Sequence, residues 1–223
     1  ISYFILPVLG RVNLGILSIP FTILWVVGLT NAINWIDGLD GLAAGVSSIA
    51  CVSFLVVSLR EGDLITATLI VALMGAAIGF LKYNFYPAKV FMGDTGSNFL
   101  GFMLANIAVI GSLKSAAVLS LSIPVIILGV PIFDTLFSVW RRTRLKKSPI
   151  TPDTDHFHHR LLKLGFGHRQ AVLIIYAISG ILSLCAIILN RSPNLTSLAI
   201  VVFVIGIIGT FLWRLGLFSL SFR

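Results

Sequence analysis

The stretch IPFTILWVVGLTNAINWIDGLDGLAAG, residues 19–45, passes from an apolar run into a polar segment and back again. The polar segment carries Asn31, Asn34, Asp37 and Asp40, and a glycine follows each aspartate. Asp-Gly pairs favour tight turns, so the stretch predicts two apolar helices joined by a break. Carboxylates beside such helices are costly unless they face water, a cavity or a cation. The turn is therefore a candidate functional element.

The rest of the chain is equally apolar. Of its 223 residues, 57% are hydrophobic and 11% are charged, and the mean hydropathy is +1.04. A soluble domain carries about 25% charged residues. The apolar runs are long and continuous, which is typical of membrane helices and unlike the alternating pattern of a barrel. The composition therefore predicts an all-α polytopic membrane protein.

About seven membrane spans are expected, within one integral membrane domain covering residues 1–223. Residues 1–17 contain Pro7, Gly10 and Gly15, which break a helix, and they predict a short β-hairpin at the membrane surface or the stub of an earlier span. Cys51 and Cys185 fall inside spans, where they are expected to pack as small apolar groups. The expected spans are 18–34, 42–59, 64–81, 97–112, 116–140, 169–189 and 195–213.

Lysine and arginine are distributed unequally between the two sides of the expected membrane. With the basic and histidine-rich loop 141–168 placed in the cytoplasm, twelve of these residues fall inside and four outside. This is the positive-inside bias of membrane proteins. The inner twelve are Lys82, Lys89, Arg141, Arg142, Arg144, Lys146, Lys147, Arg160, Lys163, Arg169, Arg214 and Arg223; the outer four are Arg11, Arg60, Lys114 and Arg191.

The other polar residues collect on the same inner side. Six of the eight acidic residues and all four histidines fall at or near it. This distribution predicts a multi-pass protein of the plasma (inner) membrane whose active site and C-terminus face the cytoplasm. The net charge of +8 follows from this topology and requires no nucleic acid partner.

A second polar stretch, KYNFYPAKVFMGDTGSNFLG at residues 82–101, precedes a span expected to open at Ser97. Asp94 lies between Gly93 and Gly96, and glycines let the backbone approach a ligand closely. Backbone N–H groups at a helix start attract phosphate. A carboxylate placed there is a hard oxygen ligand suited to Mg²⁺. The stretch therefore predicts a site for a metal and phosphates.

Four other polar or aromatic residues have both functional and structural interpretations. Asn84 and Phe91 could hold the edge and the face of a nucleotide base, but Phe91 taken alone fits an interfacial aromatic anchor better. Asp37 and Asp40 are three positions apart, so one turn presents both carboxylates together. The structural alternative is a polar turn in which Asp40 caps the next helix.

A third stretch, PDTDHFHHRLLKLG at residues 152–165, is rich in histidine. It could hold zinc, with Asp153 or Asp155 as a further ligand. It could instead hold an anionic diphosphate through imidazole and guanidinium groups, and the preceding basic run RRTRLKK favours this anion site because cations repel a metal ion. The residues concerned are His156, His158, His159 and Arg160.

Asp134 lies in GVPIFDTLFSVWRR, near the inner end of an expected span. An intramembrane carboxylate usually pairs with a cation. Asp134 is therefore expected to pair with Arg141 or Arg142, and this structural role is favoured over a catalytic one.

In this order, the segments resemble the polyprenyl-phosphate N-acetylhexosamine-1-phosphate transferases. The resemblance covers nearly the whole chain and is carried by NAINWIDGLDGLAAG, NFYPAKVFMGDTGSNFLG, PIFDTLF and DHFHHRLLKLG. The His-x-His-His-Arg form is similar to the branch that transfers N-acetylglucosamine 1-phosphate to undecaprenyl phosphate for teichoic acid, O-antigen lipopolysaccharide and related cell-wall polymers. The phospho-N-acetylmuramoyl-pentapeptide transferases of peptidoglycan synthesis rank second.

The resemblance implies a UDP-sugar as donor, undecaprenyl phosphate as acceptor, release of UMP, and Mg²⁺ or Mn²⁺ as cofactor. It implies that the uracil is held at Asp40, Asn84 and Phe91. It also implies that the histidine loop meets the diphosphate or the sugar. The expected metal ligand is Asp94, the expected catalytic residues are Asp94, Asp37, His158 and His159, and the expected substrate-binding residues are Asn34, Asp40, Asn84, Phe91, His156 and Arg160.

The resembling family also carries an aspartate-rich motif in an earlier cytoplasmic loop, and no acidic residue precedes Asp37 in this sequence. The chain is therefore expected to be the C-terminal part of a longer transferase and to be inactive alone. A membrane transporter is the competing class, although the acids gather at one face. A purely structural scaffold would not need GDTGS beside a histidine loop. The exact sugar and the oligomeric state, a homodimer included, stay open.

Overall fold

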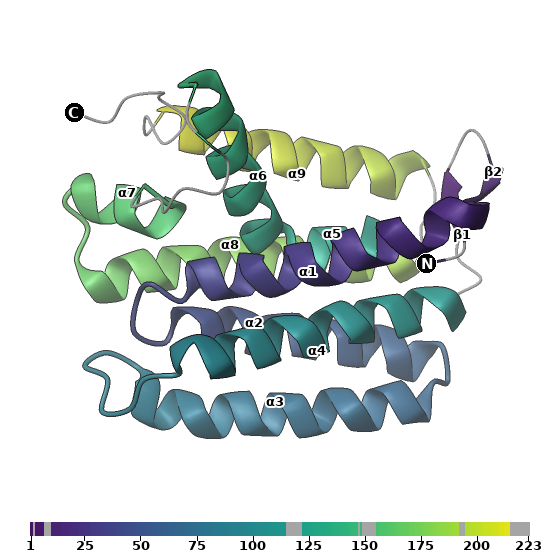
Figure 1. The fold of residues 1–223 in the computed structure, drawn as a ribbon, viewed down its shortest axis with the longest axis horizontal. Coiled ribbons are helices and arrows are strands. Elements are labelled where there is room, and N and C mark those ends of the chain that lie inside the picture. Colours follow the sequence, from purple (N-terminus) through teal and green to yellow (C-terminus); the bar gives the residue numbers. More distant parts are fainter. Residues whose placement is uncertain are drawn as a thin grey trace.

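The computed structural model describes residues 1, 3–6, 10–114, 122–146, 148, 155–191 and 195–214. Within them the chain forms a bundle of long helices with one short pair of strands at its edge (Figure 1). The elements are β1 (Tyr3–Leu6), β2 (Gly10–Asn13), a 3₁₀ turn (Gly15–Leu17), α1 (Ser18–Ile36), α2 (Leu42–Arg60), α3 (Leu64–Asn84), α4 (Gly93–Lys114), α5 (Ser122–Ile127), α6 (Gly129–Arg144), α7 (Phe157–Lys163), α8 (His168–Arg191) and α9 (Leu195–Arg214).

Four helices in the described part of the chain are long and apolar enough to cross a membrane. They are α1 with the turn before it, α2, α3 and α8, which have 19 to 24 residues. A helix rises about 1.5 Å per residue, so each can span a hydrocarbon layer of about 30 Å. The prediction of a helical multi-pass membrane protein is confirmed at this level.

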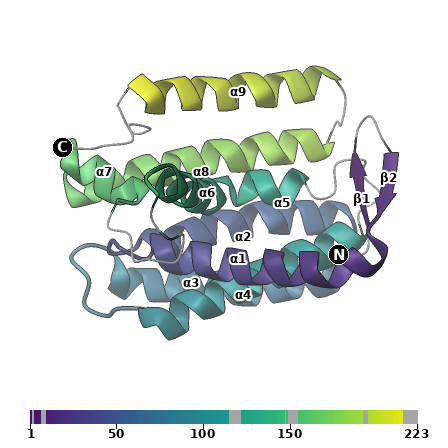
Figure 2. The same ribbon diagram turned by 45° about the horizontal axis from the view of Figure 1, so that its top comes forward.

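The long helices run nearly parallel, with α2 at the centre of the bundle and α9 outermost against α8 (Figure 2). Helix α1 packs on α4, and α2 packs on α3 and α8. Gly101 on α4 makes the first contact close, because a β-carbon there would lie 2.7 Å from the Cα atom of Thr30 on α1. Small residues permit such close backbone approach between membrane helices.

One expected span is wrong as drawn. The stretch 116–140 was expected to form a single helix, but its described part is divided at Leu128 into α5 and α6. Pro131 has no N–H to donate to Ile127, so the regular ladder is interrupted there. Figure 1 shows the result: α6 is steeply inclined to the other helices. Residues 116–121 lie outside the described part.

Two other expectations concern element ends. Helix α4 begins at Gly93, so Asp94 lies in its first turn and not before a helix opening at Ser97. Strands β1 and β2 pair antiparallel, with Tyr3 opposite Asn13. Residues 7–9 between them lie outside the described part, and the position of this pair at a membrane surface stays a prediction.

The connections that carry the polar motifs meet at one end of the bundle. In Figure 1 the α1–α2 turn, the α3–α4 connection and α7 all lie at this end, and the α2–α3 turn lies at the other. Alternating helix direction brings these connections together although they are far apart in the sequence. This end holds the candidate site.

Candidate active site

The α1–α2 turn presents two carboxylates because glycines shape its backbone. Helix α1 ends when the Asp37 amide bonds the Asn34 carbonyl at 3.2 Å. Gly41 then adopts φ +81, a left-handed conformation that favours glycine. Its amide donates to Oδ1 of Asn84 at 3.0 Å. The turn is thus fixed by α3, and Asp37 and Asp40 emerge on one short loop.

Asp40 and Asn84 connect this turn to the α3–α4 connection. Oδ2 of Asp40 accepts from the Ala88 amide at 3.0 Å, and Nδ2 of Asn84 donates to the Val90 carbonyl at 2.9 Å. The alternative in which Asp40 caps α2 is wrong, since the residue before α2 is Gly41 and no side chain bonds its first turn. Asn84 is buried. Both residues therefore at least hold the α3–α4 connection in place through these bonds.

A cavity of about 270 Å³ opens where these segments meet. Six of the ten predicted site residues line it, together with Gly38, Leu39, Met92 and Gly93. Phe91 is 74% exposed, so its ring is available to a ligand at the rim. The six predicted residues are Asn34, Asp37, Asp40, Asn84, Phe91 and Asp94. The structure brings them together, and their individual roles stay predictions.

Three aspartates line this cavity: Asp37 and Asp40 from the α1–α2 turn and Asp94 from the first turn of α4. Asp94 is exposed in the first turn of α4, and its Oδ1 lies 3.3 Å from Nδ2 of Asn34. The same amide donates to Oγ of Ser97 at 2.8 Å, so Asn34 holds the start of α4 against α1. Burial, together with the charge of Asp94, raises the pKa of Asp37 to about 6. The site therefore concentrates negative charge.

Asp37 and Asp94 fit a magnesium ion. No group of three or more His, Cys, Asp or Glu converges as a metal site among the described residues. Mg²⁺ needs no such group, because it usually takes one or two carboxylates and completes its shell with water and substrate phosphates. Two hard oxygen donors that repel each other beside an open cavity are the donor set that this ion would stabilise.

The start of α8 supports the same connection, and sequence reasoning missed this role. Nε2 of His168 accepts from the Asp40 amide at 2.9 Å, and its ring stacks on Tyr86 at 4.4 Å. Arg169 donates to the Tyr86 carbonyl at 3.1 Å. The only signal in the sequence was the position of His168 at the inner face, because nothing local links it to residues more than 80 positions away.

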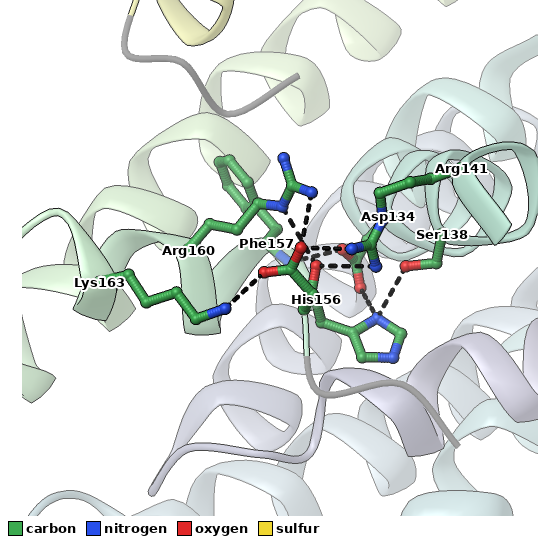
Figure 3. A network of polar contacts seen from close by, with 8 residues as sticks. Asp134, Ser138, Arg141, His156, Phe157, Arg160 and Lys163 are labelled. Atoms are coloured by element: carbon green, nitrogen blue, oxygen red, sulfur yellow. Dashed lines mark hydrogen bonds and ion pairs between the residues drawn. The ribbon is translucent and has the colours of Figure 1, made fainter. Parts of the chain in front are cut away.

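The histidine-rich stretch forms a short helix, α7, that is fixed to α6. Figure 3 shows Asp134 between His156 and the start of α7. Oδ2 of Asp134 lies 2.8 Å from Nδ1 of His156, and Oδ1 accepts from the Phe157 amide at 2.7 Å. The expected pairing of Asp134 with Arg141 or Arg142 is therefore wrong. Its partners are His156 and the Phe157 amide, and the structural role favoured for Asp134 stays a prediction.

Three cations surround Asp155 beside this pair. Arg141 from α6 bonds its Oδ2, Arg160 bonds the same oxygen at 2.7 Å, and Lys163 bonds Oδ1 at 2.9 Å. Burial alone would raise the pKa of Asp155, but Lys163, Arg160 and Arg141 outweigh it and lower this pKa. The guanidinium of Arg160 is thus held inside the protein, and its contact with a diphosphate stays a prediction.

His158 connects α7 to the cavity. A β-carbon on Gly38 would lie 2.2 Å from Nε2 of His158, so the ring sits directly against the turn. Among the described residues, this buried Nε2 has no hydrogen-bond partner. Burial and the neighbouring His159 lower the pKa of His158 to about 3, so its ring is neutral at physiological pH. His159 is half-buried, and burial also lowers its pKa.

The zinc alternative for this stretch has little geometric support in the described residues. His156 directs Nδ1 at Asp134, and the rings of His156 and His158 stack with centroids 6.0 Å apart instead of converging on one point. Asp153, one of the two acids considered as a further ligand, lies outside the described residues. Asp155 is occupied by the three cations.

Several known proteins are similar in sequence to this chain. The family model "Glycosyl transferase family 4" matches residues 1–112, which include the three aspartates that line the cavity. The probable undecaprenyl-phosphate N-acetylglucosaminyl 1-phosphate transferase of Bacillus subtilis (strain 168) is 48% identical over 202 residues, covering 90% of this chain and 56% of the relative.

Two further relatives extend the comparison. A decaprenyl-phosphate N-acetylglucosaminephosphotransferase of Mycolicibacterium smegmatis is 43% identical over 74% of this chain and 46% of the relative. A phospho-N-acetylmuramoyl-pentapeptide-transferase of Clostridium beijerinckii is 38% identical over 77% of this chain and 51% of the relative. The chain therefore spans about half the length of the curated relatives it matches. With the family model covering half of its residues and these relatives aligned over most of it, the chain belongs to glycosyl transferase family 4.

Proposed function

We propose that this chain is the membrane-embedded catalytic part of an enzyme that transfers N-acetylglucosamine 1-phosphate from UDP-N-acetylglucosamine to undecaprenyl phosphate. UMP leaves and a polyprenyl diphosphosugar remains. The observation that carries the proposal is the pair Asp37 and Asp94 at a cavity on the polar end of an apolar bundle. The name of the Bacillus subtilis relative supports this choice of donor and acceptor.

The reaction must bring a diphosphate and a lipid phosphate together, and their negative charges repel. Mg²⁺ held by Asp94, with Asp37 beside it, would polarise the transferred phosphoryl group and offset the charge on the departing UMP. Asn34 keeps the Asp94 carboxylate in place through its 3.3 Å contact. A phosphate monoester is largely ionised at neutral pH, so the acceptor needs no general base to become a nucleophile.

The uridine end of the donor fits the other side of the cavity. Phe91 offers an exposed ring for stacking, at the end of the connection that Asn84 and Asp40 support. Base–aromatic stacking contributes about 1–3 kcal/mol. The hydrogen bonds of Asp40 and Asn84 hold this connection in place. The two residues define the position of the base even where their own polar atoms are used internally.

The acceptor's isoprenoid chain fits an apolar cavity of about 320 Å³ between α1 and the α5–α6 pair. Its lining includes Phe21, Leu24 and Trp25 from α1 and Ile132 and Leu136 from α6. Helix α1 continues from this cavity to Asp37, so a lipid lying along α1 would direct its phosphate toward the carboxylates. Burying such a chain is favourable by about 25 cal/mol per Å² of apolar surface.

The histidine helix α7 lies against the α1–α2 turn, where His158 meets Gly38. We assign His158, His159 and Arg160 to the diphosphosugar and not to zinc. The support is the excess of cations over Asp155 in this region: Arg141, Arg160 and Lys163 surround a single carboxylate. Such an excess attracts phosphate and repels a metal ion.

The proposed topology has seven spans with the site in the cytoplasm. To the four apolar helices we add α4, α9 and the α5–α6 pair, since α4 and α9 have 22 and 20 residues and run beside the others (Figure 1). The cytoplasmic orientation rests on the excess of Lys and Arg at the end that carries α7. UDP-sugars are made in the cytoplasm, which agrees with this side.

The test uses the intact protein with Asp94→Asn, UDP-N-acetylglucosamine and undecaprenyl phosphate, and it measures UMP release. Turnover should fall about a thousandfold, because lost charge stabilisation costs several kcal/mol of barrier. Glu61→Gln is the control: it removes an exposed acid at the far end of the bundle and should retain activity. Normal turnover by folded Asp94→Asn would refute the metal assignment. Turnover by the wild type with UDP-N-acetylmuramoyl-pentapeptide alone would favour the related transferase.

A further inference from the structure

Asp134 makes contacts that none of the assigned roles explains. Its side chain is 3% exposed and lies on α6, the helix that changes direction after Leu128. Both carboxylate oxygens are used: one accepts from the Phe157 amide at 2.7 Å, and the other lies 2.8 Å from Nδ1 of His156 (Figure 3). A carboxylate this buried is costly unless such bonds hold it, so its position is strongly determined.

This contact fixes the tautomer of His156. A carboxylate only accepts hydrogen bonds, so Nδ1 carries a proton, and in a singly protonated ring Nε2 is then an acceptor. Oγ of Ser138 lies 3.3 Å from the same Nδ1 and, as a hydroxyl, can accept from it. No residue in the described part of the chain bonds Nε2, which leaves this acceptor to a ligand or to water.

The same carboxylate seats α7. The helix has seven residues and begins at Phe157, directly after His156, so the Asp134 bond to the Phe157 amide fixes its first turn. The next residue, His158, lies against Gly38 of the turn between the two carboxylates of the α1–α2 loop. A displacement at the start of so short a helix would therefore move His158 away from the cavity wall.

We propose that Asp134 is a positioning residue of the transferase: it orients the His156 ring and seats α7, so that the histidines are held against the turn carrying Asp37 and Asp40. This role also explains the break between α5 and α6, because the break inclines α6 and so brings Asp134 to α7. This inference rests on the proposed function, but its test has a readout that does not depend on turnover.

The first arm of the test measures kinetics in the intact protein. Asp134→Asn retains the oxygen that accepts from Phe157 but presents an NH₂ group to Nδ1 of His156, which forces the opposite tautomer. The kcat should fall about 10- to 100-fold, as when an orienting partner is lost, with KM for the UDP-sugar changed less than about threefold. His156→Gln should cause a similar fall, and the double variant should be no worse than either single variant.

The second arm measures hydrogen exchange of the α7 backbone. Asp134→Ala removes both bonds, so the amides of 157–163 should exchange at least about tenfold faster, while those of α3 should not change. Asp63→Asn is the matched control, because Asp63 is a second buried carboxylate that caps a helix, bonding the Thr66 amide at 3.2 Å at the far end of the bundle. It should lower thermal stability and leave kcat and α7 exchange unchanged.

Each outcome is decisive. Independent, multiplying losses for Asp134→Asn and His156→Gln would overturn the proposal, and so would unchanged α7 exchange in Asp134→Ala. A loss of turnover in Asp63→Asn as large as in Asp134→Asn would reduce the effect to general destabilisation and reject a positioning role. If the wild type transfers no sugar phosphate, the proposed function fails, and the exchange arm still decides whether Asp134 seats α7.

Discussion

Gly38 is important because glycine has no β-carbon. Its neighbours Asp37 and Asp40 face the cavity, and the ring of His158 occupies the space where a side chain at Gly38 would stand. The imidazole is neutral because burial and His159 lower its pKa to about 3. A neutral ring can lie against a backbone without the cost of a buried charge. The contact between the histidine helix and the carboxylate turn therefore requires glycine on one side and an uncharged histidine on the other.

Gly38→Ala should push the His158 ring out of its position, since the new β-carbon would lie 2.2 Å from Nε2. We expect a loss of about 1–3 kcal/mol of stability, typical of overpacking, and a clear fall in turnover. Thermal unfolding in detergent and UMP release measure the two effects. Gly79→Ala is the control, because a β-carbon at that helical position has no neighbour within 4 Å. His158→Ala in the same chain should relieve the clash, so a double variant less stable than His158→Ala alone would contradict this explanation.

At the scale of elements, α7 is held to α6 by charge as well as by Asp134. Arg141 comes from α6, whereas Arg160 and Lys163 come from α7, and all three meet at Asp155. The side chain of Asp155 is 13% exposed, so solvent screens its ion pairs only weakly. Removing one partner of such a cluster leaves the others uncompensated, which is more costly than the net value of any single pair.

Asp155→Asn should therefore destabilise the α6–α7 contact by about 3 kcal/mol at pH 7. The pKa of Asp155 is lowered in the folded state, so its stabilisation is fully present above the unfolded pKa of about 3.9 and is lost as pH falls through the lower folded value. Unfolding curves of wild type and variant should thus converge below about pH 4. Lys163→Met should cost less, under about 1 kcal/mol, because that side chain is 47% exposed. A difference that is independent of pH would argue against the charge explanation.

The helices themselves were largely predictable, because a membrane helix is encoded by a continuous apolar run. The expected spans 42–59 and 195–213 differ from α2 and α9 by one residue at one end. The break at Leu128 was missed although Pro131 was visible, since proline is often tolerated inside membrane helices. Helix α4 was expected to start too late, because the glycines of GDTGS suggested a loop where the structure has a first turn.

The candidate site was predictable by residue type but not by partner. Acids and amides in apolar surroundings mark a polar site, so Asn34, Asp37 and Asp94 could be selected before their cavity was known. The contact between Asp134 and His156 joins residues 22 positions apart on separate elements, and nothing local specifies it. Pairing with one of the two nearby arginines was the simpler expectation for Asp134. This expectation was wrong, and Arg141 bonds Asp155 instead.

At the scale of the whole molecule, the two ends of the bundle carry different polar groups. The cavity, α7 and the basic end of α6 share one end, whereas Glu61 at the end of α2 meets Asn190 of α8 at the other, at 3.4 Å. An enzyme that joins a soluble nucleotide sugar to a lipid needs one polar face at the membrane boundary and an apolar body beneath it. The bundle has this form, so under the proposed function its orientation decides which compartment supplies the donor.

The end with α7 should face the cytoplasm. Lys146 and Glu61 are both exposed and lie at opposite ends, which makes them a matched pair for labelling. In intact cells, a membrane-impermeant maleimide should label Glu61→Cys and should reach Lys146→Cys only after the membrane is opened, because the excess of Lys and Arg keeps that end inside. The natural Cys51 and Cys185 are buried, so background labelling should be low. Labelling of Lys146→Cys from outside intact cells, with Glu61→Cys protected, would invert the topology and place the proposed site on the side that has no UDP-sugar.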